Sequence, residues 1–174
     1  MDGHQMSHHY TMCGLDYVFL RNGYHHHETD YGPGISIEQP DVLDRAIADN
    51  IIFSPARIGG QEVRFLRSMT HKSQTEIARE LGIRRITVAR WEAAPNTPIP
   101  GPADRALRLF TAKNLFEYHG LNILVDLFSE ITDERPERLE MTYLPEQEPE
   151  AELPIFNDEK PGDEPWRPAK VRVA

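Results

Sequence analysis

The sequence predicts a mainly α-helical fold, preceded by a small α+β module and followed by a disordered acidic tail. Three observations lead to this prediction. Helical patterns fill most of residues 41–131, short apolar runs surround Gly and Pro turns in residues 10–37, and Pro, Glu and Asp dominate from about residue 143. We therefore expect an N-terminal module at 1–53, a helical domain at 54–132 and a tail at 133–174.

The N-terminal module combines short strands with one helix. Residues 16–21 and 34–37 are predicted strands beside Gly-containing turns at 22–23 and 32–34. Pro40-Asp41 then begins a helix that reaches Phe53, and its apolar positions share one face. These positions are Val42, Leu43, Ala46, Ile47 and Ile51.

The helical domain is centred on the stretch KSQTEIARELGIRRITVARWE, residues 72–92. Ser73 stands three residues before Glu76, which is the capping box that starts a helix. Gly82 ends that helix, and a second helix follows from about Arg84. The small side chain of Ala78 suits the close crossing of two helices, so the pattern is that of a helix-turn-helix. Further helices are expected at about 59–68, 102–118 and 121–131.

Charge is segregated along the chain. The whole sequence has 19 basic and 28 acidic residues, a net charge of −9. By segment, residues 1–53 have 2 basic and 8 acidic side chains (−6), 54–113 have 11 and 5 (+6), and 114–174 have 6 and 15 (−9). The helix-turn-helix stretch therefore lies in a basic segment between two acidic ones, as a nucleic-acid-binding element requires.

Residues 59–110 resemble the Cro and lambda-repressor type of helix-turn-helix domain, the Xre family. The resemblance rests on an Arg-containing first helix, Ser-Gln, a small Ala, Leu-Gly-Ile and Thr-Val-x-Arg-Trp-Glu. It implies a lambda-repressor-like five-helix DNA-binding domain in a sequence-specific transcriptional regulator. Such a protein would be a repressor or autorepressor that binds a palindromic operator, with the helix at 84–93 in the major groove.

The same resemblance assigns roles to individual residues. Gln74 would contact a phosphate and the adjacent bases, while Arg85 and Ile86 take the base-reading positions. Arg84 stands where the family usually has a Ser or Thr cap. The residues implied in DNA binding are Gln74, Thr75, Arg84, Arg85, Ile86, Thr87 and Arg90, and Arg67 and Glu92 match the family's structural ion pair.

A second resemblance supports an alternative function. The order of an N-terminal module, a connecting helix, GQEVRFLR and then PIPGPADRALRLF is similar to that of MqsA-type antitoxins. It implies a protein that binds and neutralises a toxin partner, with DNA autoregulation attached. That family's N-terminal module binds zinc through two Cys-x-x-Cys pairs, whereas this chain has only Cys13. The histidines at 25–27 lack ligand spacing, so we expect no metal and no cofactor.

Catalysis and membrane insertion are not indicated. We find no nucleophile with a base and an orienting group, no phosphate loop and no dinucleotide fingerprint, so we expect no enzyme. No apolar run approaches 18 residues and no leader is present, which predicts a cytoplasmic protein without a membrane partner.

Assembly is the last expectation. The predicted helix at 121–131 has an apolar face of Leu121, Leu124, Leu127, Phe128 and Ile131. This face predicts a homodimer, and the alternative is that it closes the core of a single chain. The acidic tail is interpreted as a solvating segment, as a ligand for a basic partner such as a toxin, or as a competitor of DNA. Within it, residues 154–156 and Trp166 are apolar anchors.

Overall fold

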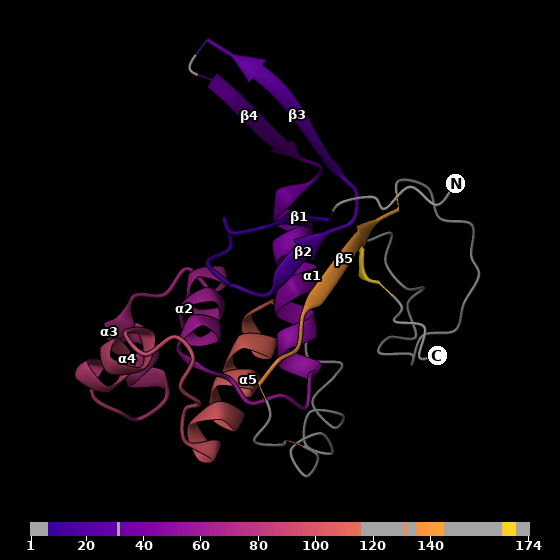
Figure 1. Cartoon of the computed structure of the whole chain (residues 1–174). Helices are drawn as coiled ribbons and strands as arrows, with labels where there is room; N and C mark the ends of the chain where they lie inside the picture. The colour runs from indigo at the N-terminus through magenta and orange to yellow at the C-terminus, as the bar shows by residue number, and fades with distance from the viewer. Residues whose placement is uncertain (1–6, 31, 116–130, 132–134, 145–164, 170–174) are drawn as a thin grey trace.

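The computed structural model describes residues 7–30, 32–115, 131, 135–144 and 165–169 (Figure 1). These residues form five α-helices and six β-strands arranged in two sheets. The protein is therefore a mixed α+β protein, and the prediction of a mainly α fold is wrong. The strands are two to six residues long, and the pairing of Val18–Leu20 with Leu139–Tyr143 joins segments more than a hundred residues apart in sequence.

The helices lie near the ranges expected for them. Their bounds are α1 (Pro40–Phe53), α2 (Gly60–Met69), α3 (Gln74–Glu80), α4 (Arg85–Glu92) and α5 (Gly101–Leu115). The predicted helix at 121–131 lies outside the described residues except for Ile131, and so does the dimer contact assigned to it. None of the helices in the described part of the chain is both long and apolar enough to cross a bilayer.

The larger sheet unites the two ends of the chain. Its strands, in spatial order, are β1 (His8–His9), β2 (Val18–Leu20), β5 (Leu139–Tyr143) and β6 (Trp166–Pro168). β2 pairs with β1 and β5, antiparallel to the first and parallel to the second, and β6 runs antiparallel to β5. Segments of the predicted disordered tail therefore supply two of the four strands, and the tail prediction is wrong for residues 139–143 and 166–168.

A two-stranded hairpin projects from the body (Figure 1). It consists of β3 (Tyr24–Thr29) and β4 (Gly32–Ile37), paired antiparallel along their whole length. The predicted turn at residues 32–34 is therefore strand. A two-stranded ribbon consists of edge strands, and an edge tolerates Pro33 because no ladder hydrogen bond is needed there.

Helix α1 lies between the four-stranded sheet and the helices α2 and α5. It packs against α2, α5 and β6, so its apolar face is enclosed on several sides. Leu43, Ile47 and Ile52 are fully buried in one core cluster with residues of the sheet and of α2 to α5. The helix-turn-helix is thus built onto the same core as the N-terminal sheet.

A buried arginine fixes the end of α1 to α5. Arg108 is completely buried, and its Nε donates to Asp104 Oδ1 at 2.6 Å. Its Nη1 donates to the carbonyls of Ile51, Ile52 and Ser54, and its Nη2 donates to Ala56 O. The last carbonyls of a helix have no partner inside the helix. Arg108 supplies that partner and so sets where α1 ends and where the helix-turn-helix domain begins.

Candidate nucleic-acid interface

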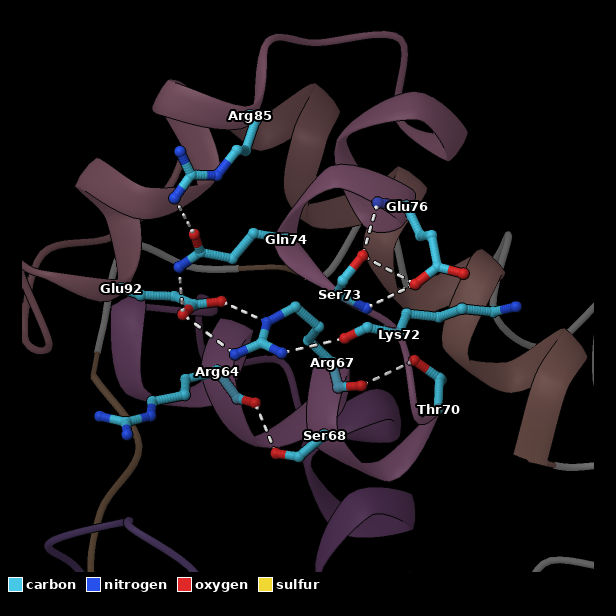
Figure 2. Close-up of polar contacts among 10 residues, drawn as sticks. All are labelled: Arg64, Arg67, Ser68, Thr70, Lys72, Ser73, Gln74, Glu76, Arg85 and Glu92. Atoms are coloured by element: carbon cyan, nitrogen blue, oxygen red, sulfur yellow. Dashed lines mark hydrogen bonds and ion pairs between the residues drawn. The ribbon is translucent and has the colours of Figure 1, made fainter.

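Helix α3 begins at a complete capping box (Figure 2). Ser73 Oγ accepts from Glu76 N at 3.2 Å, and Glu76 Oε2 accepts from Ser73 N at 2.8 Å and from Ser73 Oγ at 2.7 Å. These hydrogen bonds favour the ionised carboxylate and hold the pKa of Glu76 below its ordinary value. The carboxylate also lies at the positive end of the helix dipole. The start of α3 is therefore fixed by its own residues.

The turn between α3 and α4 is a Schellman motif. Gly82 has a φ of 66°, a left-handed conformation that glycine adopts without strain. Its N–H donates to Arg79 O, and Ile83 N donates to Ala78 O at 2.9 Å. The buried side chain of Ala78 lies in the same turn. The motif ends α3 and directs the chain into α4.

The turn between α2 and α3 has the same geometry without a glycine. His71 has a φ of 53°, its N–H donates to Ser68 O, and Lys72 N donates to Arg67 O at 3.3 Å. A side chain with a β-carbon is disfavoured in this conformation. The strained histidine is exposed, beside the helix pair that forms the candidate interface.

A chain of polar contacts joins the inner ion pair to the outer surface (Figure 2). Arg67 binds both carboxylate oxygens of Glu92, at 2.6 Å to Oε1 and 3.2 Å to Oε2. Glu92 Oε2 also accepts from Gln74 Nε2 at 3.0 Å, and Gln74 Oε1 accepts from Arg85 Nη2 at 3.3 Å. The structure therefore brings together four of the residues singled out in the sequence, from α2, α3 and α4.

The ion pair holds Glu92 in its charged form. Burial by itself raises the pKa of this carboxyl group. Hydrogen bonds from Arg67 and Gln74 and the charges of Arg67 and Arg64 lower the pKa by more than burial raises it. The net effect is a pKa below the ordinary value. Since the Glu92 side chain is only 8% exposed, its charge is turned inward and does not face the outer surface of α4.

The outer surface of α4 is basic. Arg84, Arg85 and Arg90 are exposed, and Ile86 is 46% exposed, which is unusual for a large apolar side chain in this protein. Ile86 and Arg90 are four residues apart and lie on one face of the helix. Glu92, the acidic residue within α4, is the one turned inward. The remaining candidates, Thr75 and Thr87, are exposed and half-buried respectively.

Arg84 occupies the N-cap of α4 without capping it. Its backbone is extended, its carbonyl accepts from Thr87 N at 2.9 Å, and no side-chain hydrogen bond caps the helix. A Ser or Thr at this position would accept a backbone N–H. The arginine instead places a cation at the helix start, where the backbone N–H groups already favour an anion.

Sequence reasoning did not single out Arg64 or Gly60, which also shape this region. Arg64 is an exposed α2 residue whose charge contributes to the low pKa of Glu92. At Gly60, a β-carbon would come within 2.0 Å of Trp91 O, so glycine allows α2 to approach the end of α4. A glycine selected for close approach has no local signature, because its partner lies some thirty residues away.

The histidines and Cys13 are distributed differently from a metal site. The His8 ring lies 5.2 Å from Tyr24 and 6.1 Å from His26, and His25 Nε2 is 2.9 Å from Glu38 Oε1. No group of three or more potential ligands suited to a metal ion occurs among the described residues. Burial raises the pKa of the Cys13 thiol to about 11, which keeps it protonated at neutral pH.

Comparison with known proteins assigns no family to the chain: no protein-family model, curated protein or solved structure matches it.

Proposed function

We propose that the protein is a cytoplasmic, sequence-specific DNA-binding regulator of transcription, and that α4 enters the major groove. The observation that carries the proposal is the basic outer face of α4 together with its anchoring. Arg85 is held from inside by the contact chain through Gln74, Glu92 and Arg67, and its guanidinium lies at the exposed end of that chain. An arginine that is both exposed and positioned is suited to bidentate contact with a guanine edge.

The surrounding residues support the same proposal. Arg84 precedes Arg85 in sequence and Arg90 lies one turn beyond Ile86, and both are exposed cations suited to phosphate contacts that position the helix. Two acidic groups of α3 and α4 are engaged elsewhere, because Glu76 caps α3 and Glu92 binds Arg67. A protein with a net charge of −9 can therefore still present a local surface that attracts DNA.

Gel-shift titrations with the DNA upstream of the protein's own gene, and with a randomised duplex pool, test the proposal. Arg85→Ala is expected to lose about 1–3 kcal/mol of discrimination between specific and random DNA. Arg84→Ala is expected to weaken all duplexes about equally and to lower the salt dependence by about one ion. Binding to neither DNA sample at low salt would exclude the function.

The matched control is Arg105→Ala. Arg105 is an exposed arginine of α5, outside the α3–α4 pair, so its loss removes one positive charge without changing the candidate interface. If Arg105→Ala reduces DNA affinity as much as Arg85→Ala does, then net charge rather than α4 determines binding, and the assignment of α4 is wrong.

A further inference from the structure

Trp166 occupies a closed socket at the base of the β3–β4 hairpin. The indole is 1% exposed, its Nε1 donates to Glu38 O at 2.7 Å, and its ring lies 5.2 Å from the ring of Tyr143. Gly23 forms the floor: a β-carbon there would come within 2.5 Å of the indole. Gly23 and Glu38 flank the two ends of the hairpin and are joined by the hydrogen bond from Glu38 N to Gly23 O at 2.9 Å.

The backbone around Trp166 adds a strand to the sheet. β6 is antiparallel to β5, with Trp166 opposite Tyr143 and Pro168 opposite Met141. Two further hydrogen bonds flank the strand, from Leu144 N to Pro165 O at 2.6 Å and from Ala169 N to Glu140 O at 2.7 Å. This is the arrangement of a bound peptide that extends a sheet: backbone pairing supplies affinity and one deep side-chain socket supplies selectivity.

The connection between β5 and β6 is much longer than their geometry requires. Leu144 and Pro165 are hydrogen-bonded neighbours, yet residues 145–164 separate them, a connection of 20 residues. Antiparallel neighbours are usually joined by about two to five residues. Twenty residues can extend to about 66–72 Å. Residues 165–169 would therefore stay tethered to the protein after leaving the socket.

We propose that this socket is a peptide-binding site for a partner protein, and that the chain's own residues 165–169 are its resident competitor. The resident segment defines the chemistry of the partner: an extended stretch with a Trp whose N–H reaches Glu38 O, and a Pro two residues later. The proline fits because β6 is the outermost strand of its sheet, where no ladder hydrogen bond is required on the outer side.

Displacement would reach the rest of the N-terminal module. Trp166 lies against the hairpin base through Gly23 and Glu38, and β6 packs against α1, whose other end is fixed by Arg108. Exchange of the resident segment for a partner therefore alters contacts of both the projecting hairpin and the helix that supports the helix-turn-helix. The site is separate from the α4 surface, so this proposal does not depend on DNA binding.

The test uses the full chain with a specific protease site introduced between residues 150 and 158. The probe is a labelled synthetic peptide, DEPWRPAKV, the sequence of residues 163–171. A flexible tether of this length gives the resident segment an effective concentration on the order of 1 mM, so a peptide with a Kd of about 100 µM should bind about tenfold more weakly before cleavage than after it. The cleaved segment is first removed by dilution. Binding of the labelled probe is then measured by fluorescence anisotropy.

Three controls make the result interpretable. The same peptide with Ala in place of Trp should not bind. Gly23→Ala should prevent binding because its β-carbon fills the socket, whereas Gly14→Ala should not, since Gly14 has a similar φ of 80° but no atom within 4 Å of the added carbon. The uncleaved Trp166→Ala chain should bind the probe more tightly than the uncleaved wild type, and no more tightly than the cleaved chain with the native segment removed.

Two outcomes would overturn the proposal. One is a probe affinity that is unchanged by cleavage, by Trp166→Ala and by replacement of the peptide's Trp. The other is a dimer of the uncleaved wild type that disappears in Trp166→Ala, because the socket's partner would then be a second copy of this chain and not another protein.

Discussion

Glu92 is the residue on which the candidate interface depends most directly. Its carboxylate receives Arg67 from α2 and Gln74 from α3, so one side chain joins three helices. The pair is largely buried, with side-chain exposures of 19% for Arg67 and 8% for Glu92. A charge in such a position is costly to leave without its partner.

We predict that Arg67→Ala and Glu92→Ala are each destabilising by about 2–4 kcal/mol. The double variant should lose at least about 1 kcal/mol less than the sum, because it leaves no unpaired charge. Urea denaturation of the four proteins measures the coupling, and Glu80→Ala, an exposed change on α3, should stay within about 0.5 kcal/mol of the wild type. Strictly additive losses would show that the ion pair contributes nothing as a pair.

The low pKa of Glu92 predicts a stability change with pH. Its folded-state pKa lies below the value of about 4.3 expected in the unfolded chain, so the contribution is fully present above that pH. It is lost as the pH falls through the lower folded-state pKa. The difference in unfolding free energy between wild type and Glu92→Gln should therefore be constant from pH 7 to pH 5 and shrink towards pH 3. A difference that grows on acidification would contradict the assignment.

At the scale of elements, the two turns that flank α3 can be compared, one between α2 and α3 and the other between α3 and α4. Both end a helix with a Schellman motif, but one uses Gly82 and the other uses His71 in the same left-handed region. The hydrogen bonds are equivalent, so the difference between the turns is the conformational cost of a β-carbon.

We predict opposite effects for reciprocal substitutions. Gly82→Ala should be destabilising by about 1–2 kcal/mol, since no atom lies within 4 Å of the added carbon and strain is the only cost. His71→Gly should be neutral or stabilising by up to about 1 kcal/mol, as relief of strain opposes the greater entropy of the unfolded chain. Thermal denaturation measures both. Destabilisation by His71→Gly as large as that of Gly82→Ala would mean that the His71 side chain makes a contact that matters.

Arg108 sets the junction between α1 and α5, and its removal should be severe. Arg108→Met leaves Asp104 as an unpaired charge in a fully buried site and leaves the carbonyls at the end of α1 without donors. The expected loss is about 3–5 kcal/mol. Lys113→Met, an exposed change near the end of the same helix, should change stability by less than about 0.5 kcal/mol. Equal denaturation midpoints for the two variants would contradict the role given to Arg108.

The elements that could be predicted are those defined by neighbours in sequence. The capping box at Ser73 and the glycine at residue 82 bound α3 through contacts within five residues, and both are legible in the sequence. β5 and β6 depend instead on a sheet whose other members are more than a hundred residues away. A segment whose composition cannot form a core alone can still place one tryptophan in an existing core, as Trp166 does. For this reason the composition of residues 166–168 wrongly predicts disorder.

In the candidate site, too, the features set by local sequence can be predicted and those set by contacts between helices cannot. The positions of Arg85, Ile86 and Arg90 follow from helical spacing, which a sequence displays directly. The orientation of Arg85 does not, because it is set by Gln74 from another helix. Neither does the fit of Gly60 against Trp91, which exists only once α2 and α4 have met.

For the whole molecule, the proposed function predicts a stoichiometry. One helix in one groove reads few base pairs, so we expect two copies on a palindromic site, with their α4 helices about 34 Å apart. Analytical ultracentrifugation with a labelled duplex should give two chains per duplex. Lengthening the spacer between half-sites by about 5 bp should abolish joint binding, because it rotates one half-site to the opposite side of the DNA. One chain per duplex at saturation would exclude the paired arrangement.

The parallel pairing of β2 with β5 also determines the order in which the protein can assemble during synthesis. Leu20 and Met141 are paired across 121 residues, so β2 leaves the ribosome well before its neighbour exists. At about 5–20 residues per second, the delay is roughly 6–24 s. The capping box, both turns and α2 to α5 are all complete within that interval. The helix-turn-helix can therefore form early, while one edge of β2 stays unpaired until the second half of the sheet is made, and a chaperone that binds exposed strand edges would find its target there.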